Sequence, residues 1–239
     1  MQTSSGSNNN QAEDQDWLDW LRLEPTIYDE MVYKSNPVNS YINRHGHRWC
    51  EKQFGKNIYF NRVLEVGGGT GEHLHHIKHS YSTYHLTDLN SKLLDKARSI
   101  WDSNSKIIFE EADTLKLKYP DNYFDRLISM ANLEHIPNPH IALKEWKRVV
   151  KPGGTISIMI PTEGGIAWNL GRYLTTRRYF QKKGLSLDYI IAREHINACY
   201  RLHALIMFYF EKRKDHWWPT GIPTAQINLI FATQIIVQK

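Results

Sequence analysis

Strand-like and helix-like segments alternate along this chain from about residue 58 onward. Between the strand-like segments lie stretches with helical spacing, such as "LLDKARSIW" and "IALKEWKRVV". Because strands that alternate with helices form parallel sheets covered on both faces, the pattern predicts a doubly wound α/β fold. The apolar, β-branched runs that we assign to strands are 62–66, 83–87, 107–110, 124–130 and 155–160.

The last third of the chain departs from this alternation. "RLHALIMFYF" is typical of a helix, "EKRKDHW" of an edge strand and "INLIFATQIIVQK" of a long closing strand. We therefore expect an antiparallel hairpin to complete the sheet. Within the alternating part, Asn90 is placed to cap a helix beginning at Ser91, and "KPGG" at 151–154 is placed to end a helix that starts near Pro139.

The N-terminal part has a different composition. Residues 1–16 are polar and nearly free of apolar groups, which predicts a flexible tail. Residues 17–57 contain helical segments, the first ending near Glu24, and residues 58–239 form the main domain with a helical insert at about 162–210.

Composition excludes several classes of protein. The two cysteines, Cys50 and Cys199, lie far apart and suggest neither a disulfide framework nor a zinc site, so we expect a cytoplasmic protein. The longest apolar run, "ALIMFYF", is far below the roughly 18 residues that span a bilayer, so no membrane insertion is expected. The formal charge of +5 leaves room for an anionic ligand.

A glycine-rich turn follows the first predicted strand, in "RVLEVGGGTGEHLHHI" at 62–77. Glycines at such a turn remove the Cβ atoms that would keep a ligand from the backbone, and ligands bind at the carboxyl ends of parallel strands. The nicotinamide-binding pattern would need a third glycine where Glu72 stands. Instead the spacing is Glu65-x-Gly67-x-Gly69-x-Gly71.

This spacing resembles the first motif of the class I S-adenosylmethionine-dependent methyltransferases. Four further segments are similar to later motifs of that family and follow in order: "YHLTDLN", "EEADTLKL", "YFDRLISMANLEHIPNP" and "LKEWKRVVKPGGTISIMIP". The resemblance covers roughly residues 58–161. It implies a mostly parallel, seven-stranded Rossmann-like sheet with an antiparallel C-terminal hairpin and a helical lid, and S-adenosylmethionine as the cofactor.

The resemblance also implies roles for single residues. Asp88 would bind both ribose hydroxyls, Asp113 would face the adenine amino group, and Glu65 would organise the loop and contact the cofactor amino group. Ala112 and Thr114 would flank the adenine ring. The full implied set is Glu65, Gly67, Gly68, Gly69, Asp88, Leu89, Ala112, Asp113, Thr114, Met130 and Asn132.

Two histidines are candidate general bases. A sulfonium methyl group is already activated, so transfer needs mainly a nucleophile held in line with it in a dry site. His135 in "NLEHIP" follows the fourth strand, with Glu134 able to orient it, and the alternative is that it only shapes the loop. His195 in "REHINA" is the competing candidate.

No metal site is predicted. In "EHLHHIKH", His75 and His79 stand at metal-ligand spacing on an expected helix. Because no further ligand is in evident register, a solvated helix face is the preferred interpretation.

The acceptor is expected to be a small molecule methylated on oxygen or nitrogen, with sugars, glycan precursors and secondary metabolites as candidate classes. The segment Met130–Leu133 lacks the motif of nucleobase amine methyltransferases, and no cysteine is placed for cytosine C5 chemistry, so no nucleic acid partner is expected. Two alternatives stay open: an RNA-modifying methyltransferase and a non-catalytic, methyltransferase-like binding module.

In this family an insert such as 162–210 and the N-terminal helices cover the substrate, here with Tyr28 and Tyr33. Basic side chains in the insert are candidates to meet a phosphate or carboxylate of an anionic acceptor, and a solvated helix face is the alternative. They are Arg172, Arg177, Arg178, Lys182 and Lys183.

Overall fold

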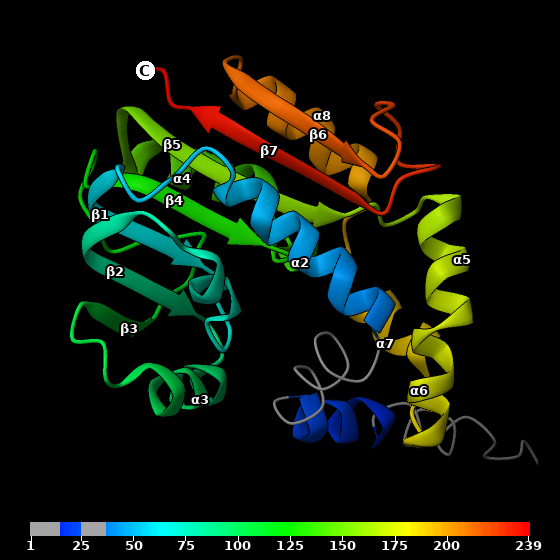
Figure 1. The fold of residues 1–239 in the computed structure, drawn as a ribbon. Helices are drawn as coiled ribbons and strands as arrows, with labels where there is room; N and C mark the ends of the chain where they lie inside the picture. The colour runs from blue at the N-terminus through cyan, green and yellow to red at the C-terminus, as the bar shows by residue number, and fades with distance from the viewer. Residues whose placement is uncertain (1–14, 25–36) are drawn as a thin grey trace, which may run out of the picture.

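A seven-stranded sheet forms the centre of the protein, as seen in a computed structural model that describes residues 15–24 and 37–239 (Figure 1). The strand order is β3-β2-β1-β4-β5-β7-β6, and only β7 runs antiparallel to its neighbours. The strands are β1 (Tyr59–Val66), β2 (Ser80–Asp88), β3 (Ile107–Glu111), β4 (Phe124–Met130), β5 (Val150–Pro161), β6 (Arg213–Trp218) and β7 (Ile230–Ile236). The predicted mostly parallel sheet with a closing antiparallel hairpin is confirmed.

Helices cover both faces of the sheet. The face with α2 (Pro37–Glu51) and α3 (Ser91–Trp101) is in front in Figure 1, and the face with α4 (Pro139–Val149) and α8 (Cys199–Tyr209) is behind. Each face has its own apolar core, the first containing Cys50 and Leu94 and the second Trp146 and Leu202. β1 supplies both cores, because Val63 points to one face and Leu64 to the other.

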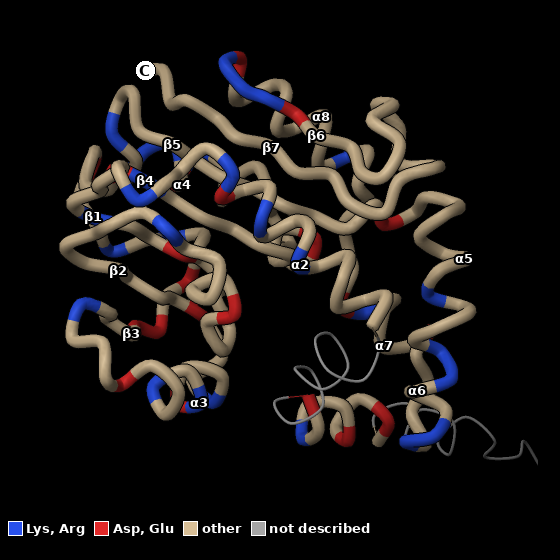
Figure 2. The backbone as a smooth tube through the Cα atoms, in the orientation of Figure 1, with Lys and Arg blue, Asp and Glu red and all other residues tan. Residues whose placement is uncertain are grey.

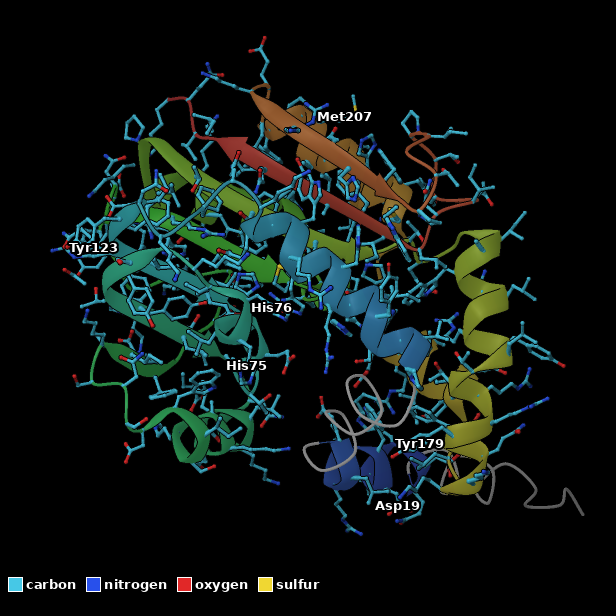
Figure 3. The ribbon with its side chains drawn as sticks, viewed as in Figure 1. Asp19, His75, His76, Tyr123, Tyr179 and Met207 are labelled. Atoms are coloured by element: carbon cyan, nitrogen blue, oxygen red, sulfur yellow. The ribbon has the colours of Figure 1, made fainter. Side chains whose placement is uncertain are left out.

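A third, smaller core lies outside the sheet. It joins the helix at residues 15–24 to α6 (Thr176–Lys182) and α7 (Leu187–Glu194), with Trp20 and Phe180 rings 5.4 Å apart. Figure 3 shows Asp19 of the N-terminal helix and Tyr179 of α6 near each other at this corner. Together with α5 (Ile166–Leu174), these helices form what we call the lid: residues 15–24 and α5–α7.

The structure shows how two helices predicted from local sequence signals begin and end. The Asn90 side chain accepts a hydrogen bond from the Lys92 amide, 3.1 Å away, and caps α3 as predicted. α4 begins at Pro139 and ends at Val149, two residues before the "KPGG" segment, which lies at the start of β5.

The prediction of a regular helix after the glycine loop is wrong. Only a five-residue 3-10 helix, η2 (Glu72–His76), connects β1 to β2, because Gly71 in a left-handed conformation (φ 81°) starts it and β2 begins already at Ser80. α2 contacts η2 and covers this part of the sheet instead. His79 is buried against Phe60 rather than solvated, whereas His75 is exposed and contacts Trp101.

Of the predicted tail, residues 1–14 lie outside the described residues, and residues 15 and 16 already belong to the first helix. Within the described part of the chain, no helix is long and apolar enough to cross a membrane.

Candidate active site

A first cavity of about 390 Å³ opens at the carboxyl ends of β1, β2 and β4. This is the edge of a parallel sheet at which ligands bind. Its walls combine the glycine loop with carboxylates and histidines, including Glu65, Gly67, Gly68, Gly69, His73, Asp88, Met130, Ala131, Asn132 and His135. We call it the cofactor cavity.

The backbone of the glycine loop is held in a form that only glycine adopts easily. Gly67 and Gly69 have φ values of 63° and 53°. A Cβ atom on Gly67 would lie 2.2 Å from the side chain of Asn132, whereas one on Gly69 would meet nothing within 4 Å. Gly67 therefore lets the loop after β4 approach β1, and Gly69 leaves space for a ligand.

Two carboxylates stand on either side of this loop. Asp88 accepts hydrogen bonds from the amides of Gly69 (2.9 Å) and Asn90 (2.8 Å), and burial raises its pKa above the ordinary value. Glu65 is fully buried and accepts a hydrogen bond from the Tyr84 hydroxyl at 2.6 Å. Burial also raises the pKa of Glu65 above its ordinary value.

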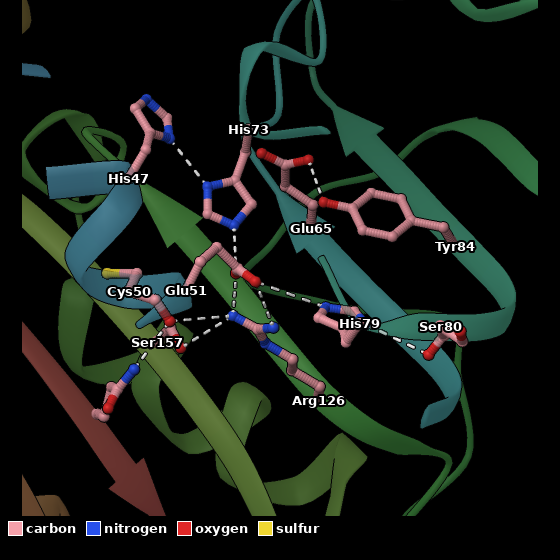
Figure 4. A network of polar contacts seen from close by, with 11 residues as sticks. His47, Cys50, Glu51, Glu65, His73, His79, Ser80, Tyr84, Arg126 and Ser157 are labelled. Atoms are coloured by element: carbon pink, nitrogen blue, oxygen red, sulfur yellow. Dashed lines mark hydrogen bonds and ion pairs between the residues drawn. The ribbon is translucent and has the colours of Figure 1, made fainter. Parts of the chain in front are cut away.

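A buried polar network supports the wall of the cofactor cavity beside Glu65 (Figure 4). The Arg126 guanidinium pairs with Glu51, which also lies 2.8 Å from His73 Nε2, and His73 Nδ1 lies 2.8 Å from His47 Nδ1. Although burial by itself would raise it, Arg126 and His73 lower the pKa of Glu51 to about 2. The network fixes the two imidazoles that line the cavity, His47 and His73.

Four residues of the implied cofactor set do not line this cavity: Leu89, Ala112, Asp113 and Thr114. Leu89 is 68% exposed, and Asp113 accepts a hydrogen bond from the Leu115 amide. The Thr114 hydroxyl accepts one from the Trp146 indole, 2.7 Å away, on the α4 side of the sheet. Contacts of these four residues with a cofactor stay a prediction.

A second cavity of about 200 Å³ lies between α2, the end of β5 and the lid. Its walls are largely apolar, with Trp20, Ile42, Met159, Phe180, Leu187, Ile190 and Ile230 among them. The Trp20 indole donates a hydrogen bond to the Glu194 carboxyl group, which ties the N-terminal helix to α7. We call this space the acceptor cavity.

The two cavities meet at three residues, Ala131, His135 and Glu194, which line both. Ala131 directly follows β4 and has a left-handed backbone (φ 48°), a conformation unfavourable for a residue with a Cβ atom. The turn brings Asn132 over Gly67 and carries His135 to the junction. His135 thus lies where a group held in one cavity would face a group held in the other.

The candidate bases His135 and His195 are brought together, with ring centroids 4.7 Å apart at an angle of 80°. Burial and the nearby His195 lower the pKa of His135 well below its ordinary value, so this imidazole is neutral at physiological pH. His195 Nδ1 lies 2.9 Å from Glu163 Oε2, so the Nδ1–H donates to the carboxylate and the ring is held in one orientation.

Glu163 was not predicted from the sequence. Its Oε2 also accepts hydrogen bonds from the Trp168 indole and the Arg172 guanidinium, each 2.9 Å away. Although burial would raise it, the hydrogen bond with His195 and the charge of Arg172 lower the pKa of Glu163, so the carboxylate is ionised. The signal in the sequence is an acidic residue two positions after β5 and 32 residues before His195, a separation that no local pattern reveals.

The pKa of Glu134 is shifted in the opposite direction to that of Glu163. Its side chain is buried in the wall of the acceptor cavity, and its Oε2 has no hydrogen-bond partner among the described residues. Burial raises the pKa of Glu134 to about 8, so this carboxyl group is neutral at pH 7. The nearest nitrogen of His135 lies 3.8 Å from Oε1, too far for the expected orienting hydrogen bond.

Most basic residues of the insert point away from the acceptor cavity. Among the five named above, only Arg172 lines it, and its guanidinium is paired with Glu163. Arg177 pairs with Asp188, and Arg178 is exposed. Tyr28 and Tyr33, expected over the acceptor, lie outside the described residues.

Comparison with known proteins finds similarity to methyltransferases. Residues 64–158 match the model of a methyltransferase domain. A ubiquinone/menaquinone biosynthesis C-methyltransferase UbiE of Coxiella burnetii is 28% identical over 147 residues, which cover 56% of this chain and 57% of that protein. The UbiE of Chromobacterium violaceum is 34% identical over 107 residues, covering 41% of this chain and 42% of that protein. The chain thus spans only about half the length of these relatives.

The fold is shared over a longer stretch. The crystal structure of the N-methyltransferase NodS from Bradyrhizobium japonicum, in complex with S-adenosyl-L-homocysteine, superposes with a TM-score of 0.63 at 12% identity, covering 94% of this chain and 99% of that one. The matched domain, the ordered motifs and the sheet topology together support a class I S-adenosylmethionine-dependent methyltransferase.

Proposed function

We propose that this protein transfers a methyl group from S-adenosylmethionine to a small molecule that has an apolar body and one protic group. The single observation that carries the proposal is the junction at His135, where the polar cavity at the glycine loop meets the apolar cavity under the lid. Transfer in line requires donor and acceptor in neighbouring, water-excluding sites.

The residues of the cofactor cavity fit this cofactor. Asp88 offers acceptor oxygens for ribose hydroxyls, Glu65 a buried carboxyl group for an amino group, and Gly69 an open approach to the backbone. When bound, S-adenosylmethionine supplies a sulfonium methyl group that is already electrophilic.

The protein's own residues then orient the acceptor and take its proton. His195, held by Glu163 with Nε2 as the acceptor atom, is suited to accept a proton from a hydroxyl or amine in the acceptor cavity. His135 stays neutral beside it, so no fixed charge at the junction repels the sulfonium. Glu134, protonated at pH 7, can donate a hydrogen bond to the acceptor.

The lining of the acceptor cavity narrows the expected acceptor. Its apolar walls support a secondary-metabolite-like molecule over a free sugar, with transfer to oxygen or nitrogen. Arg172 is already paired with Glu163, so its charge is largely neutralised for an anionic acceptor. A second candidate is transfer to an activated carbon, because the matching relatives in quinone biosynthesis are C-methyltransferases by name.

The test is a methyl-transfer screen by mass spectrometry. The full-length protein is incubated with S-adenosylmethionine and a panel of phenols, catechols, quinols, aliphatic amines and free sugars, and products are sought at a mass increase of one methyl group. We expect product from an apolar phenol, quinol or amine and none from the sugars. Methylation of sugars alone, or of structured RNA included as a separate arm, would contradict the proposal.

A further inference from the structure

One helix of the lid exposes its apolar face. In α5 the side chains of Ile166, Leu170, Tyr173 and Leu174 are each more than half exposed, and no residue of this helix is buried. Their spacing of i, i+4, i+7 and i+8 places them on one stripe of the helix. Side chains of this size on one stripe form a contiguous apolar patch, which marks an interaction surface in soluble proteins.

The opposite face of α5 is the one held by the protein. Trp168 and Arg172 bond to Glu163, and with Thr175 they line the acceptor cavity. At the start of the helix, the Ala167 amide donates a hydrogen bond to the Gln226 carbonyl, 2.9 Å away. With these contacts, the side chains of Trp168 and Arg172 face the acceptor cavity and the apolar stripe of α5 faces the solvent.

Positive charge flanks this stripe. Residues 164–187 include five cations and no aspartate or glutamate. Figure 2 shows the blue segments of α6 at the outer edge of the molecule, directly beyond α5. Arg178 and Lys182 are exposed there and make no ion pair with a described residue, and the Arg177 guanidinium lies 5.1 Å from the Tyr173 ring centre.

We propose that α5 and α6 dock this protein onto the surface of a membrane that contains anionic phospholipid. The apolar stripe of α5 would enter the boundary between headgroups and acyl chains, and the cations of α6 would contact the phosphates, as in interfacial amphipathic helices. This inference rests on the surface alone and does not depend on the proposed methyl transfer.

Charge and polarity favour a lipid surface over the other possible occupants. A second copy docked through the same face would bring two cationic patches together, which is unfavourable. A polynucleotide would satisfy the cations but leave four large apolar side chains without an apolar partner. An anionic bilayer satisfies both.

Vesicle flotation with the full-length protein tests the proposal. The vesicles are phosphatidylcholine alone or an equal mixture of phosphatidylcholine and phosphatidylglycerol. We expect binding to the mixed vesicles that decreases with added salt, and little binding to the neutral ones. Leu170→Ser should weaken binding about tenfold. The double variant Arg178→Gln, Lys182→Gln should weaken it by roughly 25-fold, at about fivefold for each cation.

Matched variants lie on other surfaces. Phe208→Ser removes an exposed aromatic ring on α8, where Figure 3 places Met207 far from the lid, and Lys118→Gln removes an exposed cation before β4. Both should bind like the wild type, and circular dichroism should show that all variants are folded. Absence of wild-type binding to the mixed vesicles, or equal losses in the control variants, would overturn the proposal. So would dimerisation or single-stranded RNA binding that the Leu170 variant abolishes while vesicle binding is unaffected.

Discussion

The cofactor cavity and the acceptor cavity share His135 but differ in how they are built. The cofactor cavity is made mainly of strand ends and their turns, with backbone amides of the glycine loop and carboxylates at fixed positions, and lid residues of the N-terminal helix and α7 line its remaining side. The acceptor cavity is made of side chains from helices α2, α5, α6 and α7 and residues 15–24, packed on a small separate core. The difference teaches that the glycine loop and the carboxylates of the cofactor cavity are positioned by the sheet, whereas the acceptor cavity depends mainly on the packing of the lid.

The largest expected effect concerns the acceptor side alone. His195→Asn should lower kcat about 10²–10³-fold, because it removes the proposed proton acceptor, and Glu163→Gln should lower it roughly tenfold. Neither change touches the cofactor cavity, so the Kd for S-adenosyl-L-homocysteine should stay within about twofold of wild type. Steady-state kinetics with an acceptor found in the screen gives kcat, and calorimetry gives the Kd for S-adenosyl-L-homocysteine. If Glu163 positions His195, the pH profile of Glu163→Gln should shift, whereas a merely structural role of Glu163 would leave the profile unchanged. An unchanged kcat in both variants would contradict the proposed role of His195 as proton acceptor.

Glycine substitutions dissect the cofactor side. Gly67→Ala should lower the free energy of unfolding by about 2–4 kcal/mol, because the new Cβ would clash with Asn132 at a positive φ. Gly69→Ala should cost only about 1 kcal/mol of stability yet impair cofactor binding, because its Cβ enters the open cavity.

Gly153 provides the control, since its φ is 77° and a Cβ there meets nothing within 4 Å. Gly153→Ala should resemble Gly69→Ala in urea unfolding but bind the cofactor product like the wild type. Equal binding by the Gly69 and Gly153 variants would show that the loop does not face the cofactor.

The buried Glu134 side chain should make the free energy of unfolding depend on pH. Its pKa, raised to about 8, means that the native state keeps a proton that the unfolded state loses near pH 4.5. The stability that this proton brings is complete below the unfolded pKa and is lost as pH rises toward 8. Glu134→Gln should therefore gain on the order of 4 kcal/mol of stability relative to the wild type as the pH rises from 5 to 8.5. Urea unfolding measures it, with the exposed Glu211→Gln as control, and parallel pH curves would refute the assignment.

The sequence predicted the cofactor side better than the acceptor side, for a physical reason. Glu65, the glycines and Asp88 lie at strand ends within one contiguous pattern, and chain order alone brings them to one edge of the sheet. Glu163 and His195 meet only because the lid folds back on β5, and nothing local encodes that contact.

The short connection after β1 shows a second limit. The spacing in "EHLHHIKH" is helical, but His73 is buried by its bond to Glu51 of α2, and the chain returns to the sheet after one 3-10 segment. A tertiary network of buried charge thus overrides a local helical pattern, and the pairing of His73 with Glu51, 22 residues apart, could not be deduced from spacing.

The smallest expected effect is that of chelation. Among the described residues, no group of three or more histidine, cysteine or acidic side chains could hold a metal ion, and displacement at a sulfonium needs no Lewis acid. Methyl transfer after exhaustive treatment with a chelator should equal that of untreated protein. Activity that is lost and then restored by one divalent ion would show that the acceptor side uses a metal.

Calorimetric titration with S-adenosyl-L-homocysteine tests the central claim most directly. The wild type should bind, and Asp88→Ala should bind about 1–3 kcal/mol more weakly, because it removes the carboxylate that faces the loop and the proposed ribose site. Glu163→Gln, in the acceptor cavity, should bind like the wild type. No binding of this ligand by the wild type, together with binding of NAD, would contradict the account.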